Sequence, residues 1–197
     1  MKRKAILAFA LCLALAGCGT KQDAVYVQSV ERLASAGGIA HDLSKYSPTE
    51  FWIGARYYQG NRSPNAAERE DKGYSEAWMH HKGRNRHHYE YWTDMNPQTR
   101  RYEPIPMPRK YLVEMVMDRR AACMTYQGKA YRDDAALKYF TKGRERTLMH
   151  PETARQLEYI LTMLANQGEE TTFRYLKDSV LAGKPFPWEP GGEHGKN

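Results

Sequence analysis

The sequence predicts an all-α domain behind a lipoprotein-type signal, on three observations. Residues 111–126 form an apolar run with helical spacing. Two further helices have a proline-led start, at Ser47-Pro48 and at His150-Pro151. No segment alternates apolar and polar residues as a half-buried strand does. The 197 residues, 41% of them hydrophobic, are enough for one domain with its own core.

The first 18 residues are typical of a signal peptide. Lys2, Arg3 and Lys4 are followed by an apolar stretch over residues 5–16, too short to span a membrane comfortably. The stretch ends in Leu-Ala-Gly-Cys, which looks like a lipobox with Cys18 as the lipidated residue. This predicts an envelope protein, lipid-anchored on the outer side of the cytoplasmic membrane or in the outer membrane. The alternative is an apolar first helix that ends in cysteine.

The elements that follow are short. Residues 19–38 form a linker with a brief helix over 25–34, and residues 39–182 form the main domain. Ser47 and Glu50 have the spacing of a capping box that starts a helix. Residues 61–73 are polar, with Pro64 and Gly73, and predict a loop. Residues 74–92 predict two helical pieces broken near Gly83, and residues 96–108 predict a loop or an irregular strand-like arm.

The second half carries the core. Residues 111–126, introduced by Pro108, predict the main core helix, and His150 opens another helix that ends at Gly168. A last helix is expected from about residue 170 to 181. Residues 183–197, rich in proline and glycine, predict a flexible tail.

The charge does not indicate nucleic-acid binding. The formal net charge is +7, but three of these charges belong to the signal, and acidic residues are interspersed with the basic ones elsewhere. The 14 tyrosines and four tryptophans either line a half-wet cleft or build the core.

Histidines are the main chemical signal. Five of the seven fall within 48 residues: His41, His80, His81, His87 and His88. Neutral imidazole is the commonest metal ligand and also an acid or base near neutral pH. The alternative is that these histidines only pack or hydrogen-bond in the structure.

Acidic residues on the core helix add to this signal. Glu114 and Asp118 are four residues apart and share a helix face. Carboxylates on a buried helix are costly unless they are paired or coordinate a metal. An ion pair with an arginine of another helix is the alternative. The adjacent His41 and Asp42 could both bind one metal, with Lys45 supplying a positive charge for phosphate.

The chain from about residue 41 to 181 resembles an uncharacterised bacterial family. The shared segments match HDLSKYSPTE (41–50), AWMHH (77–81), NRHHYEYW (85–92), MPRKY (107–111), EMVMDR (114–119) and MHPET (149–153). The motif order is also similar to the HD superfamily of metal-dependent phosphohydrolases. That resemblance implies a compact HD-like helical domain with His41, Asp42, His81, His87 and Asp118 as ligands of one or two metal ions. This chain has no histidine before His41, where the superfamily usually has one.

The resulting hypothesis is a metal-dependent phosphohydrolase acting on a small phosphorylated molecule. A divalent Mn, Fe or similar ion activates water, His88 supports a second metal or acts as acid, and Glu114 orients a ligand or acts as base. The phosphate contacts are expected from Lys45, Arg86 and Arg119.

Two alternatives stay open. One is a non-catalytic envelope-anchored module that binds a ligand or partner in an aromatic cleft around Trp78 and Trp92. The other is a metal-dependent hydrolase of a non-phosphate ester or amide.

Overall fold

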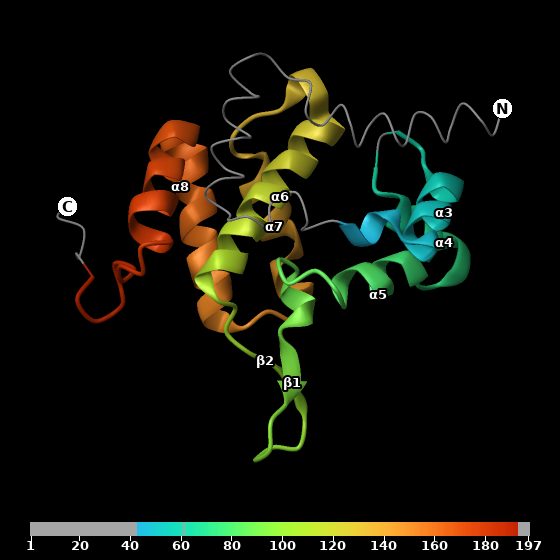
Figure 1. Cartoon of the computed structure of the whole chain (residues 1–197). Helices are drawn as coiled ribbons and strands as arrows, with labels where there is room; N and C mark the ends of the chain where they lie inside the picture. Colours follow the sequence, from blue (N-terminus) through green and yellow to red (C-terminus); the bar gives the residue numbers. More distant parts are fainter. Residues whose placement is uncertain (1–42, 61, 193–197) are drawn as a thin grey trace. The chain divides into compact units, whose positions relative to one another are not determined.

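A computed structural model describes residues 43–60 and 62–192 (Figure 1). The signal-like segment with Cys18, the expected helix over 25–34, His41 and Asp42 lie outside these residues. Within them the chain is helical apart from one small hairpin, so the predicted all-α class is confirmed. None of the described helices is both long and apolar enough to cross a membrane.

The chain divides into two units, and the first comprises residues up to Arg86 together with Thr125–Gln127. Its described elements are a 3₁₀ helix η1 (Leu43–Tyr46) and the helices α3 (Pro48–Tyr57), α4 (Pro64–Lys72) and α5 (Glu76–Lys82). Helix α3 packs against both α4 and α5 (Figure 1). The residues buried here are small or polar: Gly54, Ala67 and Ala77 beside Glu50, Glu68, Ser75, His81 and Asn85.

The start of α3 follows only half of the predicted capping box. The Ser47 hydroxyl accepts a hydrogen bond from the backbone N–H of Glu50 at 3.3 Å, as the pattern predicts. The reciprocal bond, from the Ser47 N–H to the Glu50 side chain, is not made. That N–H donates to the carbonyl of Ser44 instead, and the Glu50 carboxylate turns to two histidines.

The prediction of a loop over residues 61–73 was wrong, because α4 occupies most of it. The residues interpreted as loop signals bound the helix: Pro64 lies in its first turn, and Gly73 ends it in the left-handed conformation at φ 82°. Helix α4 contains few apolar residues. Side chains such as Arg62, paired with Glu70, and Tyr57, which donates to Asp71, hold it in place.

The second unit contains residues 87–124 and 128–197, described as far as Gly192. Its fully buried hydrophobic residues are Leu112, Val116, Leu157, Ile160, Leu161, Leu164 and Phe186, and Thr172 and His87 are buried with them. Its elements are a 3₁₀ turn η2 (Tyr89–Tyr91), strands β1 (Thr93–Met95) and β2 (Tyr102–Pro104), α6 (Arg109–Gln127, of which the last three residues group with the first unit), η3 (Gly128–Ala130), α7 (Ala135–Gly143), η4 (Arg144–Arg146), α8 (Pro151–Tyr175) and a π-helix η5 (Leu176–Val180).

Two of these helices begin where the sequence predicted. Helix α6 follows Pro108, and α8 follows His150, as predicted. Gly168 has φ 75° and ψ −179° inside α8, so the expected break is a kink within one helix. The prediction missed α7. It also expected a second helical piece after Gly83, where the chain makes only the 3₁₀ turn η2.

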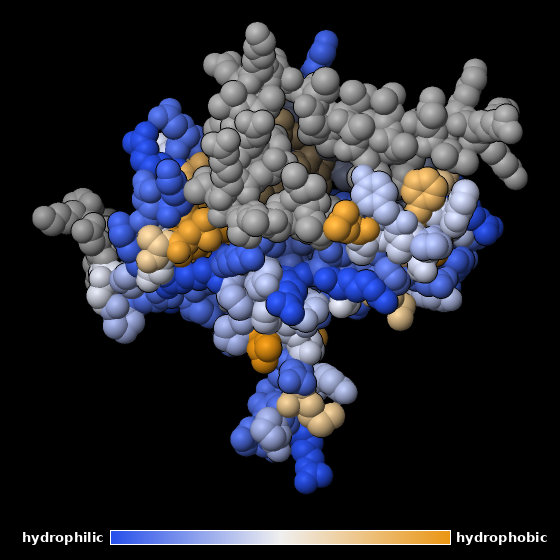
Figure 2. All heavy atoms as spheres, in the orientation of Figure 1, coloured by the Kyte–Doolittle hydropathy of each residue, from blue (hydrophilic) through white to orange (hydrophobic). Residues whose placement is uncertain are grey.

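The strand-like arm is an antiparallel hairpin in which Met95 pairs with Tyr102. Both side chains are exposed, and the loop between the strands closes through the Asn96 N–H bonded to the Arg101 carbonyl. Figure 2 shows that the face in view is mainly hydrophilic, with separate apolar residues rather than a broad apolar patch.

The start of the expected flexible tail packs on the second unit. Phe186 is fully buried and stacks with Trp188, at 5.1 Å between ring centroids. Glu189 ties this segment down by accepting hydrogen bonds from Arg109, at 2.6 Å, and from the Phe186 N–H.

Candidate metal centre

Helix α5 carries the first pair of histidines in its last turn. The Ser75 hydroxyl accepts from the Trp78 N–H at 3.0 Å, so Ser75 caps the start of the helix. His80 and His81 follow on adjacent faces. After Lys82 the chain turns back, because the backbone N–H groups of Arg84 and Asn85 both donate to the carbonyl of His81.

Glu68 anchors the beginning of α5. Its fully buried carboxylate accepts a hydrogen bond from the Ser75 hydroxyl at 2.7 Å, and Lys72 pairs with it at 3.1 Å. Burial would raise the pKa of Glu68, but the bonds from Ser75, Lys72 and two backbone N–H groups lower it overall. This carboxylate therefore stays ionised inside the unit.

A second buried carboxylate, Glu50 on α3, contacts both histidines of α5. One oxygen lies 2.6 Å from Nδ1 of His80 and the other 2.8 Å from Nδ1 of His81. The side chain of Glu50 is 5% exposed, that of His81 7% and that of His80 20%, so the His81 contact is the more deeply buried.

Two further polar residues surround His81. The side-chain amide of Asn85 donates to the Ser44 hydroxyl at 2.7 Å and to the His81 carbonyl at 2.8 Å. Trp78 packs beside the His81 ring, with centroids 5.8 Å apart, and Arg69 lies over Trp78. The imidazole therefore has a defined orientation.

The second pair of histidines follows the turn. His87 is buried and His88 is half-buried, and their ring centroids lie 4.2 Å apart. His88 directly precedes the 3₁₀ turn Tyr89–Tyr91. Burial, with help from Glu90, raises the pKa of Tyr89 to about 12, so this phenol is neutral at physiological pH.

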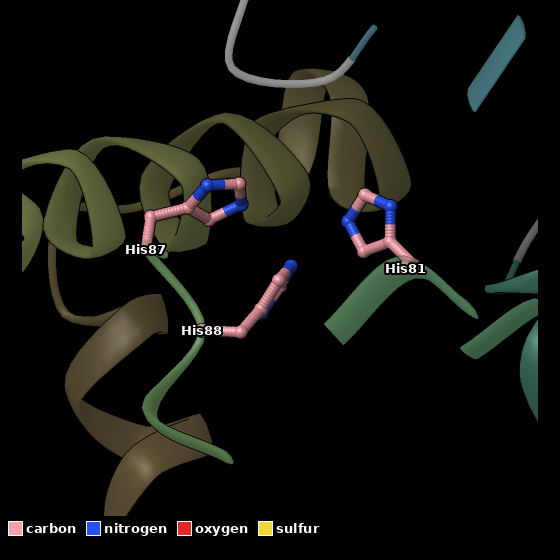
Figure 3. Close-up of side chains that lie close together, drawn as sticks. All are labelled: His81, His87 and His88. Atoms are coloured by element: carbon pink, nitrogen blue, oxygen red, sulfur yellow. The ribbon is translucent and has the colours of Figure 1, made fainter. Parts of the chain in front are cut away.

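Three histidines of this eight-residue stretch form a cluster that could hold a metal ion. His81, His87 and His88 each offer a ring nitrogen, and these nitrogens all lie within 4.8 Å of one another. Figure 3 shows a nitrogen at the near edge of the His81 and His87 rings, with His88 projecting toward the space between them. Three imidazoles are a known protein ligand set for catalytic zinc, which keeps a further position open.

The α6 residues predicted as ligands or substrate contacts are not members of this cluster. Glu114 and Asp118 are half-buried on α6. The guanidinium of Arg119 lies 6.0 Å from the ring centroids of Tyr139 and Phe140. Cys123, one turn further along, is half-buried, and burial raises the pKa of its thiol.

The remaining predicted residues lie on three different segments. Lys45 lies in η1, and Arg86 is exposed just before His87. Trp92 is half-buried and packs on Tyr111, with centroids 5.5 Å apart.

The MHPET motif has a structural explanation. His150 caps α8, its Nδ1 accepting from the Glu152 N–H at 3.2 Å. The Thr153 hydroxyl accepts from the Met107 N–H, and Glu152 accepts from the Trp188 indole. The motif thus joins the start of α8 to two other segments of the second unit.

The sequence analysis missed Ser44, Glu50 and Asn85 as site residues. All three lie in the motifs it singled out, in HDLSKYSPTE and NRHHYEYW, so the motif positions themselves were the signal. Glu50 was assigned to a helix cap, because a Ser-x-x-Glu spacing has that local meaning.

Comparison with known proteins gives one positive result. The model of a family of unknown function, DUF5662, matches residues 12–163, which is more than half of the chain. Comparisons with curated proteins and with solved structures gave no significant match. The match agrees with the uncharacterised family indicated by the motifs, and the chain belongs to the DUF5662 family.

Proposed function

We propose that this protein binds a divalent transition metal through His81, His87 and His88 and uses it to hydrolyse a phosphate ester. The observation that carries the proposal is the close approach of three ring nitrogens, two of them on buried residues. Such a cluster of three imidazoles matches a known metal-ligand set.

The ligand type favours some metals over others. Imidazole nitrogen suits Zn, Fe, Ni and Cu, whereas Mn and Mg prefer carboxylate and carbonyl oxygen. The all-histidine cluster therefore shifts the expected metal from Mn toward Zn or Fe. His41, Asp42 and Asp118, implied by the resemblance to HD phosphohydrolases, would add one nitrogen and two carboxylate ligands and could hold a second ion.

The metal would supply Lewis acidity and lower the pKa of a bound water. Three neutral imidazoles leave the positive charge of the ion uncompensated, which attracts an anionic substrate. Lys45 and Arg86 would contribute further positive charge for a phosphate group. The lipobox at Cys18 would place this chemistry in the cell envelope.

Metal content tests the first part of the proposal. The full chain, purified without chelator, should contain about one equivalent of Zn or Fe by elemental analysis, and the His81→Ala/His87→Ala/His88→Ala variant should contain none. A His41→Ala/Asp42→Ala variant is the matched comparison, since its loss of metal would add that pair to the site. Equal metal in the wild-type and triple-variant proteins would reject the cluster.

Hydrolysis tests the second part. Three chromogenic esters, p-nitrophenyl phosphate, bis(p-nitrophenyl) phosphate and p-nitrophenyl acetate, separate phosphomonoesterase, phosphodiesterase and carboxylesterase activity. The proposal expects turnover of a phosphate ester that a chelator abolishes and added metal restores. Turnover of the acetate alone would support a hydrolase of another ester. Metal binding without turnover of any of the three esters would support the alternative of a non-catalytic binding module.

A further inference from the structure

Glu50 is an unusual buried acid within its unit. Its residue is 6% exposed, and among the described residues its ion-pair partners are two histidines rather than a lysine or arginine. A buried carboxylate is costly unless hydrogen bonds compensate the lost hydration. The contacts with His80 at 2.6 Å and with His81 at 2.8 Å supply that compensation.

These contacts decide which nitrogen of His81 carries the proton. A carboxylate oxygen accepts hydrogen bonds, so in the 2.8 Å contact the Nδ1–H of His81 is the donor and Glu50 the acceptor. The Ser44 hydroxyl oxygen, 3.1 Å from this Nδ1, can accept from the same N–H. Asn85 lies 3.0 Å from Nδ1, but its amide donates to the Ser44 hydroxyl and to the His81 carbonyl. With the proton on Nδ1, the neutral ring carries its lone pair on Nε2.

A metal ligand needs this tautomer. Histidines that bind metals through one nitrogen commonly donate the other N–H to a carboxylate, which fixes the ring orientation and raises the basicity of the ligand nitrogen. The lone pair of His81 is then on the nitrogen away from Glu50, and Figure 3 shows a ring nitrogen of His81 directed toward His87 and His88.

We infer that Glu50 is the positioning residue of the metal centre, holding His81 as the Nδ1–H tautomer so that Nε2 binds the ion. This inference rests on the proposed function and adds a residue to it. The two contacts of Glu50 also join α3 to α5. Hydrogen bonds therefore link the start of α3, which Ser47 caps, to the ligand His81 on α5.

The experiment uses Glu50→Gln and Glu50→Ala in the full chain, with Co²⁺ and Zn²⁺ as the metal probes. Glu50→Gln keeps the volume but loses the charge and one of the two acceptor oxygens. The expected result is a metal affinity lowered about 10- to 100-fold, measured by competition with a chromophoric chelator. The absorption bands of bound Co²⁺ should shift as well.

The matched control is Glu68→Gln, which alters a second buried carboxylate of the same unit. It should lower thermal stability while leaving the affinity of the folded protein for Co²⁺ within about twofold of wild type. A loss of affinity in Glu50→Gln but not in Glu68→Gln would separate positioning of the ligand from general destabilisation.

The metal-free protein gives a second measurement. Long-range ¹H–¹⁵N spectra should show His81 as the Nδ1–H tautomer in wild type, and a mixture of tautomers in Glu50→Ala. Unchanged affinity in both folded Glu50 variants would overturn the inference while leaving the metal centre intact, as would an Nε2–H tautomer in wild type. Wild-type protein that binds neither metal would overturn the proposed function, and the inference with it.

Discussion

The two units differ in how much of their buried interior is aliphatic. The first unit encloses charged and polar groups such as Glu50, Glu68 and His81, whereas the centre of α8 in the second unit is aliphatic, with Leu157 and Leu161 fully buried. Aliphatic burial stabilises in proportion to area and has little directionality. A buried polar network stabilises only when every donor finds its acceptor. The stability of the first unit should therefore depend on pH, and that of α8 mainly on changes in core volume.

The largest effect is expected from the aliphatic core. Leu161→Ala should lower the free energy of unfolding of the second unit by about 3–5 kcal/mol, because a fully buried side chain leaves a cavity. Urea titration followed by hydrogen exchange of peptides from α8 measures this loss. Peptides from α3 and α5 serve as the internal control. An equal loss of protection in these peptides would show that the effect is not confined to the second unit.

Removal of Glu68 should have the next largest effect, confined to the first unit. Glu68→Ala leaves the Ser75 hydroxyl and nearby backbone N–H groups without their buried acceptor, at a cost of about 2–3 kcal/mol. Faster hydrogen exchange in α4 and α5, with α8 unchanged, is the expected result. A uniform loss across both units would argue against a local network.

Glu68 also predicts the direction of the pH dependence. Its pKa is lower in the folded protein than the usual 4.5. Its contribution to the free energy of unfolding is therefore present above pH 4.5 and is lost as the pH falls through the folded pKa. Stability of the first unit should therefore decrease as the pH falls below 4.5. The decrease should be smaller in Glu68→Gln, measured by the same exchange experiment, and an identical profile would assign acid sensitivity to other groups.

Metal should stabilise the folded protein, because the proposed ligands are His81 of the first unit and His87 and His88 of the second. If only the folded protein binds, Zn²⁺ at ten times its dissociation constant stabilises by about 1.4 kcal/mol. Thermal unfolding with Zn²⁺ and then with chelator should show this shift in wild type. The His81→Ala/His87→Ala/His88→Ala variant is the control, and an equal shift there would indicate metal bound elsewhere.

The smallest effect is expected at the start of α3. Ser47→Ala removes the cap on the Glu50 N–H and should cost about 1 kcal/mol. Ser47→Gly, which keeps a good cap geometry, should cost less. Because Glu50 follows in the same turn, weaker metal binding in Ser47→Ala would show that the cap also supports the position of Glu50. Unchanged metal affinity would show that the cap contributes to stability only.

Much of the fold could be predicted from local patterns. The apolar spacing of residues 111–126 identified α6, and His150-Pro151 located the start of α8. Gly168 was predicted to end that helix, whereas it forms a kink within it. Helix α4 could not be predicted in this way, because its stability comes from side-chain partners and not from an apolar face. The same Pro64 and Gly73 are compatible with a loop or with the two ends of a helix.

The sequence by itself determined the helical class, the family and the density of histidines that pointed to a metal. Only the tertiary structure decided which histidines come together, because that depends on the turn after α5 and on the side-chain rotamers. It also decided the role of Glu50. The local Ser-x-x-Glu spacing predicts that this carboxylate bonds to the backbone at the start of α3. The packing of α3 on α5 instead brings Nδ1 of His80 and of His81 within hydrogen-bond distance of its two oxygens.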